Sequence, residues 1–221
     1  MHFNGRKAGF SLVELVIAVV LMAFVLGLAG MISKQGIALF RTNAAINTVD
    51  SLAIRSLDRV AREVMAATST SFVPTLQTPV GNPTVWSSTL DFQEAVGWNN
   101  VAGTVVLGPT RRIVLQLAAG EINNGVDDNG DGLIDEGSVT LVENVGQPDQ
   151  MATVLVNGVS EFFAGEVLNG VDDNGNGMVD EQGFCFDAAG GTLNFQISIE
   201  RIGPDGGLLI RTHSDSIRLR N

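Results

Sequence analysis

The chain has 221 residues, of which 24 are acidic and 13 basic, for a net charge of −11. This acidic excess argues against nucleic acid as the main ligand, because neutralising phosphates requires Lys and Arg. The single cysteine, Cys185, excludes an intramolecular disulfide, and we expect it to be buried rather than reactive.

The first predicted element is a membrane-spanning helix. Residues 15–33 carry no charge, Arg6 and Lys7 precede them, and Lys34 follows. A helix over residues 10–33 is long enough to cross a hydrocarbon core about 30 Å thick, at about 1.5 Å per residue. The basic pair before it predicts a short cytoplasmic N-terminus, with the rest of the chain on the other side of the membrane. A secretory signal peptide or a plain single-span anchor would account for the apolar run alone.

One charged residue, Glu14, lies inside this apolar stretch. The residues around it, 6–15, read RKAGFSLVEL and resemble the processing site of type IV pilin-like proteins. That family includes pilus subunits and the pseudopilins of type II secretion. The resemblance implies that a prepilin peptidase removes a leader, residues 1–9, by cutting after Gly9. It also implies that the same enzyme methylates the new terminal amine, on Phe10.

The resemblance gives Glu14 a role in assembly. An unpaired carboxylate in hydrocarbon costs roughly 2 to 3 kcal/mol even on lenient insertion scales. In the family, this carboxylate pairs with the terminal amine of a neighbouring subunit, so the cost is offset when a partner arrives. The alternative is that Glu14 extends to the lipid headgroups, since it lies near the helix end.

Residues 34–67 are predicted to continue the same helix as an amphipathic segment. No Pro or Gly occurs from residue 38 to residue 67. One apolar stripe recurs at steps of three and four residues: Ile46, Val49, Ala53, Leu57, Val60 and Val64. The pattern predicts one helix of about 55 residues, with a transmembrane half (10–33) and an amphipathic half (34–67).

The remaining residues, 68–221, are predicted to form a β-rich globular domain. Residues 68–100 are rich in Ser, Thr, Pro and Asn and predict a loop with short strands. Strand patterns follow at residues 112–117, 139–142, 152–156, 193–200 and 208–219. A long helix followed by such strands predicts an α+β fold, with the helix packed on one face of an antiparallel sheet. The order of elements also resembles the pilin fold, and the late segments are similar to larger minor pilins and pseudopilins.

Two acidic loops form an internal repeat. Residues 121–136 read EINNGVDDNGDGLIDE and residues 166–181 read EVLNGVDDNGNGMVDE, which match at 11 of 16 positions at a spacing of 45. Oxygen-bearing side chains spaced by two, followed by Gly, suit a hard cation such as Ca²⁺, which takes six to eight oxygen ligands. We therefore expect structural calcium loops at residues 121–137 and 166–183.

The candidate ligands fall at equivalent positions in the two loops. In the first loop they are Asp127, Asn129, Asp131, the carbonyl of Leu133, Asp135 and Glu136. In the second they are Asp172, Asn174, Asn176, the carbonyl of Met178, Asp180 and Glu181. Ile134 and Val179 are expected to be apolar anchors. Because Asn176 replaces a carboxylate, the second site is expected to be the weaker one.

The pattern departs from a true EF-hand, since its twelfth position is Ser138 in one loop and Gly183 in the other, instead of Glu. The missing ligand is therefore open: Glu136 and Glu181, or Glu121 and Glu166. Asp128 and Asp173 are candidates to replace or supplement the first ligand. The alternative is that both segments are ordinary Asn-Gly and Asp-Gly turns that bind no ion.

No Ser–His–Asp or Cys–His set can be assembled from the sequence, so we expect no enzyme. Five arginines are expected to flank strands on a solvated face: Arg111, Arg112, Arg211, Arg218 and Arg220. The resemblance implies a minor pilin or pseudopilin in the bacterial inner membrane, with a periplasmic globular domain. Its partners would be other pilin-type subunits and the prepilin peptidase, and it would reach a filament or the cell surface. The alternative is a single-span membrane-anchored calcium-binding adhesin or sensor that does not assemble.

Overall fold

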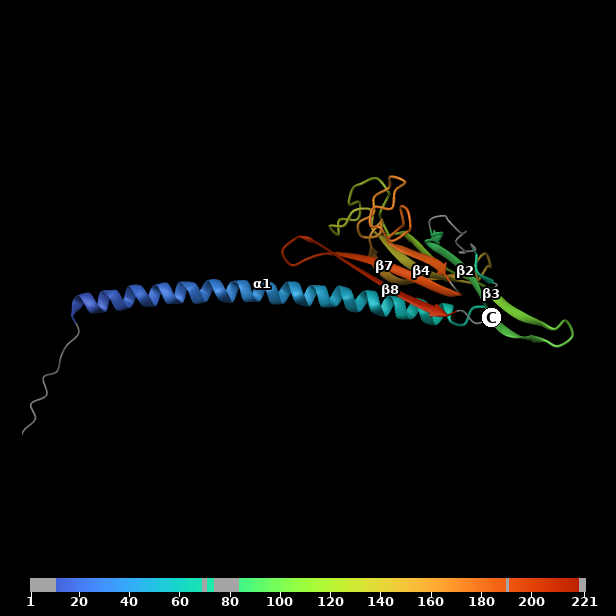
Figure 1. Ribbon diagram of the computed structural model, residues 1–221, viewed down its shortest axis with the longest axis horizontal. Helices are drawn as coiled ribbons and strands as arrows, with labels where there is room; N and C mark the ends of the chain where they lie inside the picture. The colour runs from blue at the N-terminus through green and yellow to red at the C-terminus, as the bar shows by residue number, and fades with distance from the viewer. Residues whose placement is uncertain (1–10, 69–70, 74–83, 190, 219–221) are drawn as a thin grey trace, which may run out of the picture. The chain divides into compact units, whose positions relative to one another are not determined.

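The computed structural model describes residues 11–68, 71–73, 84–189 and 191–218 (Figure 1). The predicted leader and the cleavage site, Gly9 and Phe10, lie outside these residues. The chain divides into two compact units, Met1–Ala44 and Ala45–Asn221. Each is described by itself below.

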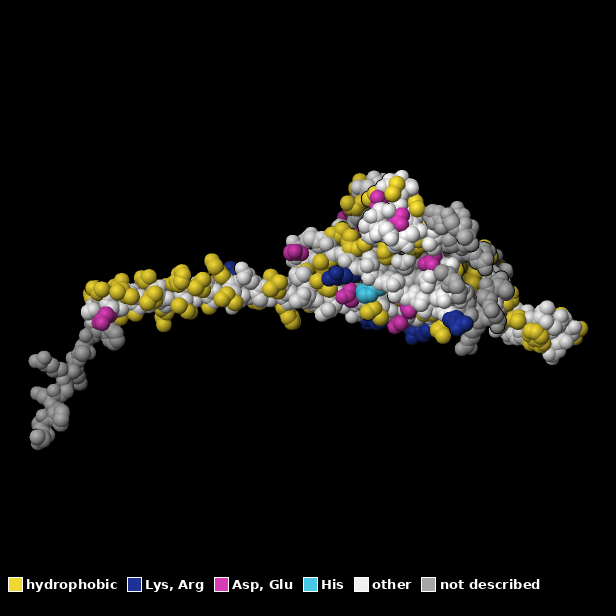
Figure 2. Space-filling model, in the orientation of Figure 1, with side chains coloured by type: hydrophobic (Ala, Val, Ile, Leu, Met, Phe, Trp, Pro, Cys, Tyr) yellow, Lys and Arg dark blue, Asp and Glu magenta, His cyan; other side chains and the backbone are white. Residues whose placement is uncertain are grey.

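The helix α1 runs from Leu12 to Val64 without interruption, through the predicted boundary between its transmembrane and amphipathic halves. By length and composition it is apolar enough to cross a membrane. Its large apolar side chains in the first unit, from Leu12 to Phe40, are exposed, and Figure 2 shows them along the visible face of the helix. A helix that is apolar on all sides is typical of a membrane span. The helix ends three residues before the predicted residue 67, and Ala67 instead forms a β-bridge with Glu94.

In the second unit, the predicted apolar stripe of α1 is confirmed as the face that packs on the sheet. Five of its members are no more than 3% exposed: Val49, Ala53, Leu57, Val60 and Val64. Ile46 is only partly buried. Burying a Val or Leu side chain contributes about 1.5 to 3 kcal/mol, so this stripe stabilises the packing of the helix on the sheet.

The sheet has eight strands, and every pairing is antiparallel. They are β1 (Trp86–Ser87), β2 (Thr89–Asn99), β3 (Thr104–Leu117), β4 (Gly137–Glu143), β5 (Met151–Val159), β6 (Phe184–Ala189), β7 (Thr192–Ile202) and β8 (Leu208–Arg218). Their order is β1-β6-β7-β5-β4-β3-β2, and β8 pairs with β7 outside this path. The α+β prediction is confirmed.

Two strands differ from the prediction. Residues 68–100, expected to be a loop with short strands, contain the two-residue β1 and also the long β2 of eleven residues, whose Leu90 and Phe92 are fully buried while its outer half is exposed. The second is β6, which lies in the core with both faces covered, so its residues do not alternate between apolar and polar. A period-two search misses strands of this second kind.

The core joins the helix stripe to aromatic side chains from the sheet. Phe184 and Phe186 of β6 pack edge to face, with ring centroids 4.9 Å apart, and Phe186 also contacts Phe195 of β7. Cys185, which stands between Phe184 and Phe186 in the sequence, is fully buried, as predicted. Burial, followed by the nearby charges of Glu181 and Asp187, raises the pKa of its thiol well above the ordinary value, so the thiolate form is suppressed.

Candidate functional site

The two acidic loops, the first at residues 121–136 and the second at 166–181, leave the same end of the sheet. The first connects β3 to β4 and the second connects β5 to β6. Because Gly137 at the start of β4 pairs with Val159 at the end of β5, the end of the first connection lies beside the start of the second (Figure 1). Asn123 of the first loop donates a side-chain hydrogen bond to Glu161, just before the second, at 2.7 Å.

Each loop closes at its base through the same backbone hydrogen bonds. Ala118 N–H donates to the Glu136 carbonyl at 3.0 Å, and Phe163 N–H donates to the Glu181 carbonyl at 3.0 Å. Gly120 has φ +98°, and a Cβ there would lie 3.2 Å from the Cβ of Asn129. Only glycine tolerates that conformation and that approach, so the loop folds back tightly on its own base. The sequence repeat is therefore a structural repeat.

Two aspartates in each loop each accept at least two backbone N–H groups. Asp127 accepts from Gly130 at 2.6 Å and from Gly132 at 2.9 Å. Asp135 accepts from Asn124 at 2.9 Å and Gly125 at 2.6 Å. The second loop repeats these contacts through Asp172 and Asp180. Carboxylates used in this way organise the turns of the loop.

Two glutamates in each loop are buried. Glu121 and Glu136 are 8% and 1% exposed, and Glu166 and Glu181 are 6% and 0% exposed. In the first loop, Glu121 accepts the backbone N–H of Asn129 at 2.8 Å, and Glu136 accepts its side-chain amide at 2.7 Å. Glu166 and Glu181 hold Asn174 in the same way, each at 2.8 Å.

In all four glutamates, one carboxylate oxygen takes these bonds and the other, Oε2, is buried without a hydrogen-bond partner among the described residues. Leaving a buried charged oxygen unpaired is costly.

The loops differ at one position. Asn176 of the second loop donates its side-chain amide to Glu181 at 2.5 Å, where the first loop has the carboxylate of Asp131. Burial raises the pKa of Glu136, and the negative charges of Asp131 and Glu121 raise it further. The first loop therefore holds more uncompensated negative charge.

The structure gathers only part of the predicted ligand set. Within the described ranges, no three His, Cys, Asp or Glu side chains are arranged to hold one metal ion. In each loop it brings two glutamates together, and both accept hydrogen bonds from the same asparagine. Of the two predicted apolar anchors, Ile134 is exposed and Val179 is partly buried, whereas the residues just before them, Leu133 and Met178, are buried.

The first turn of α1 contains a contact that the sequence analysis missed. Glu14 Oε2 accepts the backbone N–H of Ser11 at 2.9 Å, and Ser11 Oγ accepts the backbone N–H of Glu14 at 3.2 Å. This reciprocal pair is a capping box, which satisfies two N–H groups that have no partner within the helix. The S-x-x-E pattern of residues 11–14 is the signal that could have predicted it.

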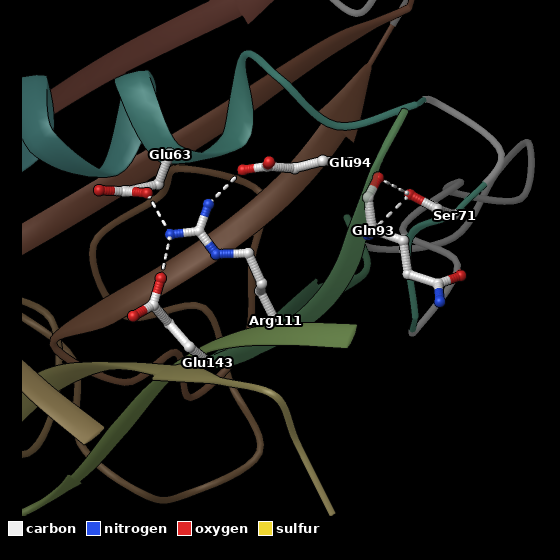
Figure 3. A network of polar contacts seen from close by, with 6 residues as sticks. All are labelled: Glu63, Ser71, Gln93, Glu94, Arg111 and Glu143. Atoms are coloured by element: carbon white, nitrogen blue, oxygen red, sulfur yellow. Dashed lines mark hydrogen bonds and ion pairs between the residues drawn. The ribbon is translucent and has the colours of Figure 1, made fainter. Parts of the chain in front are cut away.

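A polar network surrounds Arg111 of β3 (Figure 3). Its side chain, only 14% exposed, bonds Glu63 of α1 at 2.5 Å, Glu143 of β4 at 3.1 Å, and Glu94 of β2. Its guanidinium also lies over the Phe92 ring, 5.6 Å from the centroid. The expectation that Arg111 lies on a solvated face is wrong, because three carboxylates from three different elements enclose it.

Two of the other four arginines pair with a single carboxylate each, and Arg218 is exposed, as expected. Arg112 makes a bidentate contact with Asp91, at 2.5 and 2.8 Å. Asp50 of α1 lies 3.7 Å from Arg211 and 3.1 Å from His213. Arg220 lies outside the described residues. These contacts join elements of the fold and gather no catalytic set.

Comparison with known proteins identifies the N-terminal segment. Residues 4–30 match the prokaryotic N-terminal methylation motif, the prepilin-type signal of type IV pilin-like proteins. No curated protein and no solved structure matches the chain. The match includes Gly9, Phe10, Ser11 and Glu14 and ends within the apolar part of α1.

Proposed function

We propose that this chain, whose residues 4–30 carry the prepilin-type signal of type IV pilin-like proteins, is a non-enzymatic structural subunit of a pilin-type filament. The finer assignment is a minor pilin of a type IV pilus or a pseudopilin of a type II secretion system. The observation that carries the proposal is this signal, joined directly to a helix apolar enough to cross a membrane.

The subunit would be inserted in the inner membrane with its short N-terminus in the cytoplasm and its second unit in the periplasm. The prepilin peptidase would cut after Gly9 and methylate Phe10. The exposed apolar side chains of α1 would then exchange lipid contacts for contacts with the helices of neighbouring subunits.

Glu14 would have two successive partners. In the single subunit it caps the helix through Ser11. In the filament it would meet the methylated amine of a neighbouring Phe10, a charge pair that loses much stability if either member is removed. The two acidic loops would bind Ca²⁺, which would stabilise segments that lie outside the main core.

Mass spectrometry of the N-terminal peptide, on protein purified from its native membrane, tests the processing step. We expect a peptide that begins at methylated Phe10. A peptide that retains the Gly9–Phe10 bond would refute the proposal.

A second candidate is a membrane-anchored calcium-binding protein that does not assemble. The capping box favours it, because Ser11 alone gives Glu14 a partner. Replacing Glu14 by Gln separates the two candidates, since Gln retains an acceptor for Ser11 but has no charge. A filament subunit would fail to incorporate, whereas an anchored protein would keep its membrane level and its calcium binding.

A further inference from the structure

The two acidic loops share an unusual feature, a pair of buried glutamates with unsatisfied oxygens. Among the described residues, six buried side-chain nitrogen or oxygen atoms lack a hydrogen-bond partner. Four of the six are the Oε2 atoms of Glu121, Glu136, Glu166 and Glu181. The equivalent two oxygens lack a partner in each copy of the repeat, so the feature follows from the fold of the loop.

In each of the four glutamates, the other carboxylate oxygen, Oε1, accepts a hydrogen bond that fixes the side chain. Glu121 and Glu136 both bond to Asn129, one at its backbone and one at its side chain, and Glu166 and Glu181 bond to Asn174 in the same way. Each asparagine therefore holds two carboxylates, and each carboxylate keeps one buried oxygen without a partner among the described residues. In the first loop, the charge of Glu121 raises the pKa of Glu136, so the two carboxylates act on each other. Two like charges held this way repel one another unless a cation lies between them.

The neighbouring aspartates are used differently. Asp127 and Asp135 each accept two backbone N–H groups, which shapes the turns on either side of Asn129. The spacing that marks the sequence as a cation loop thus sets the path of the backbone, and the buried loop oxygens left without a partner, among the described residues, are those of the glutamates.

We propose that each acidic loop binds one Ca²⁺ between its two glutamates, Glu121 with Glu136 and Glu166 with Glu181, and that the first site is the tighter one. The inference rests on the calcium binding proposed above and assigns its central ligands. Two carboxylates neutralise the ion, and backbone carbonyls and water complete shells of this kind. Carboxylate oxygens are hard ligands, which favours Ca²⁺ over softer metals.

The inequality of the sites follows from one residue. In the second loop, the amide of Asn176 donates to Glu181 at 2.5 Å and already compensates part of its charge. In the first loop, Asp131 adds a further negative charge near Glu136. Ligand charge is a main determinant of Ca²⁺ affinity, so the first loop gains more from the ion.

Calorimetric titration of the full chain in detergent, freed of metal by a chelator, tests the proposal with CaCl₂ as the probe and MgCl₂ as a comparison. We expect two Ca²⁺ per chain, with affinities that differ about tenfold or more. Glu136→Gln should abolish the tight event and Glu181→Gln the weak one, since Gln keeps the bond to asparagine and loses the charge. The matched control is Asp149→Asn, since Asp149 lies outside both loops and accepts the Asn144 side-chain amide at 2.9 Å; this variant should bind Ca²⁺ as the wild type does.

Exchanging Asp and Asn between positions 131 and 176 provides a second test, which holds even if the glutamine variants fail to fold. Asp131→Asn should weaken the tight site about tenfold, and Asn176→Asp should strengthen the weak one about tenfold. If two Ca²⁺ still bind to Glu136→Gln and Glu181→Gln, the glutamate assignment is overturned while calcium binding stands. If no Ca²⁺ binds to the wild type, calcium binding itself fails, and the filament proposal still depends only on the N-terminal peptide.

Discussion

Arg111 of strand β3 bonds Glu63 in the last turn of α1, and this ion pair fastens the helix to the sheet at the end of its buried stripe. The same guanidinium also holds Glu94 and Glu143, so one cation offsets three carboxylates (Figure 3). Such a network is more sensitive to the loss of its centre than an isolated surface pair is.

Replacing Arg111 by Met should therefore destabilise the protein. The change leaves three carboxylates close together without a cation, and we expect the free energy of unfolding to fall by about 2 to 4 kcal/mol. Urea denaturation monitored by the fluorescence of Trp86 and Trp98 measures it. Arg111→Lys is the control, since it keeps the charge and should recover part of the loss. A loss below about 0.5 kcal/mol would show that the network is no stronger than an exposed pair.

Ser11→Ala should separate helix capping from assembly. The variant removes the hydroxyl that accepts the Glu14 N–H and should cost about 1 kcal/mol of helix stability at that end. The Glu14 charge remains, so incorporation into filaments should persist, as measured by the amount of subunit in sheared filament fractions. Loss of incorporation equal to that of Glu14→Gln would instead make the capping box itself the requirement for assembly.

Calcium should raise the thermal stability of the second unit. A ligand that binds only the folded state adds about 2.7 kcal/mol at a concentration one hundred times its dissociation constant. Thermal melts with CaCl₂ or with a chelator measure the difference, and we expect a higher midpoint with CaCl₂. In a variant with Gln at both position 136 and position 181, the two melts should coincide; a persistent shift would place the ion elsewhere.

Glu200 of β7 should make the metal-free protein less stable above neutral pH. It is 7% exposed, and burial, followed by the charges of Glu136, Asp131 and Glu161, raises its pKa to about 7. The unfolded carboxyl has an ordinary pKa near 4.3. The folded state therefore holds a proton that the unfolded state has released, and its advantage is complete below the unfolded pKa and lost as pH rises through 7.

Replacing Glu200 by Gln tests that pH dependence. In a chelator, the wild type should lose roughly 2 to 3 kcal/mol relative to Glu200→Gln between pH 4.5 and pH 8. Chemical denaturation of both proteins across this range measures it. Parallel stability curves for the two proteins would show that Glu200 does not titrate in the folded state within this range.

Secondary structure and its buried face could be predicted from the sequence where one hydrophobic periodicity dominates. The stripe from Val49 to Val64 predicted the packed face of the helix, because side chains at three- and four-residue steps share a face. The alternation of β7 likewise predicted a strand with one buried face. β6 and β2 were missed because burial on both faces, or exposure of an outer half, removes that alternation.

The site was harder to predict because its contacts are not local. The spacing of Asp127, Asn129 and Asp131 is visible in the sequence, but the fold of the loop decides which oxygens are left open. Glu121 and Glu136 stand fifteen positions apart, and the backbone bonds at the base of the loop together with Asn129, which bonds to both, bring them into one site. Arg111 shows the same limit, since its three partners come from separate elements.

The closed base of each acidic loop allows the loop to be inserted between strands of a sheet. Backbone hydrogen bonds at Ala118 and Phe163 join the two ends of each loop. Around the first loop the flanking strands β3 and β4 pair with each other, whereas around the second loop β5 and β6 both pair with β7, which lies between them. The same closed segment therefore serves both in a hairpin and in a connection that crosses a strand. A segment of this kind is a portable module, and grafting it into a third β connection should transfer its fold without rebuilding the host sheet.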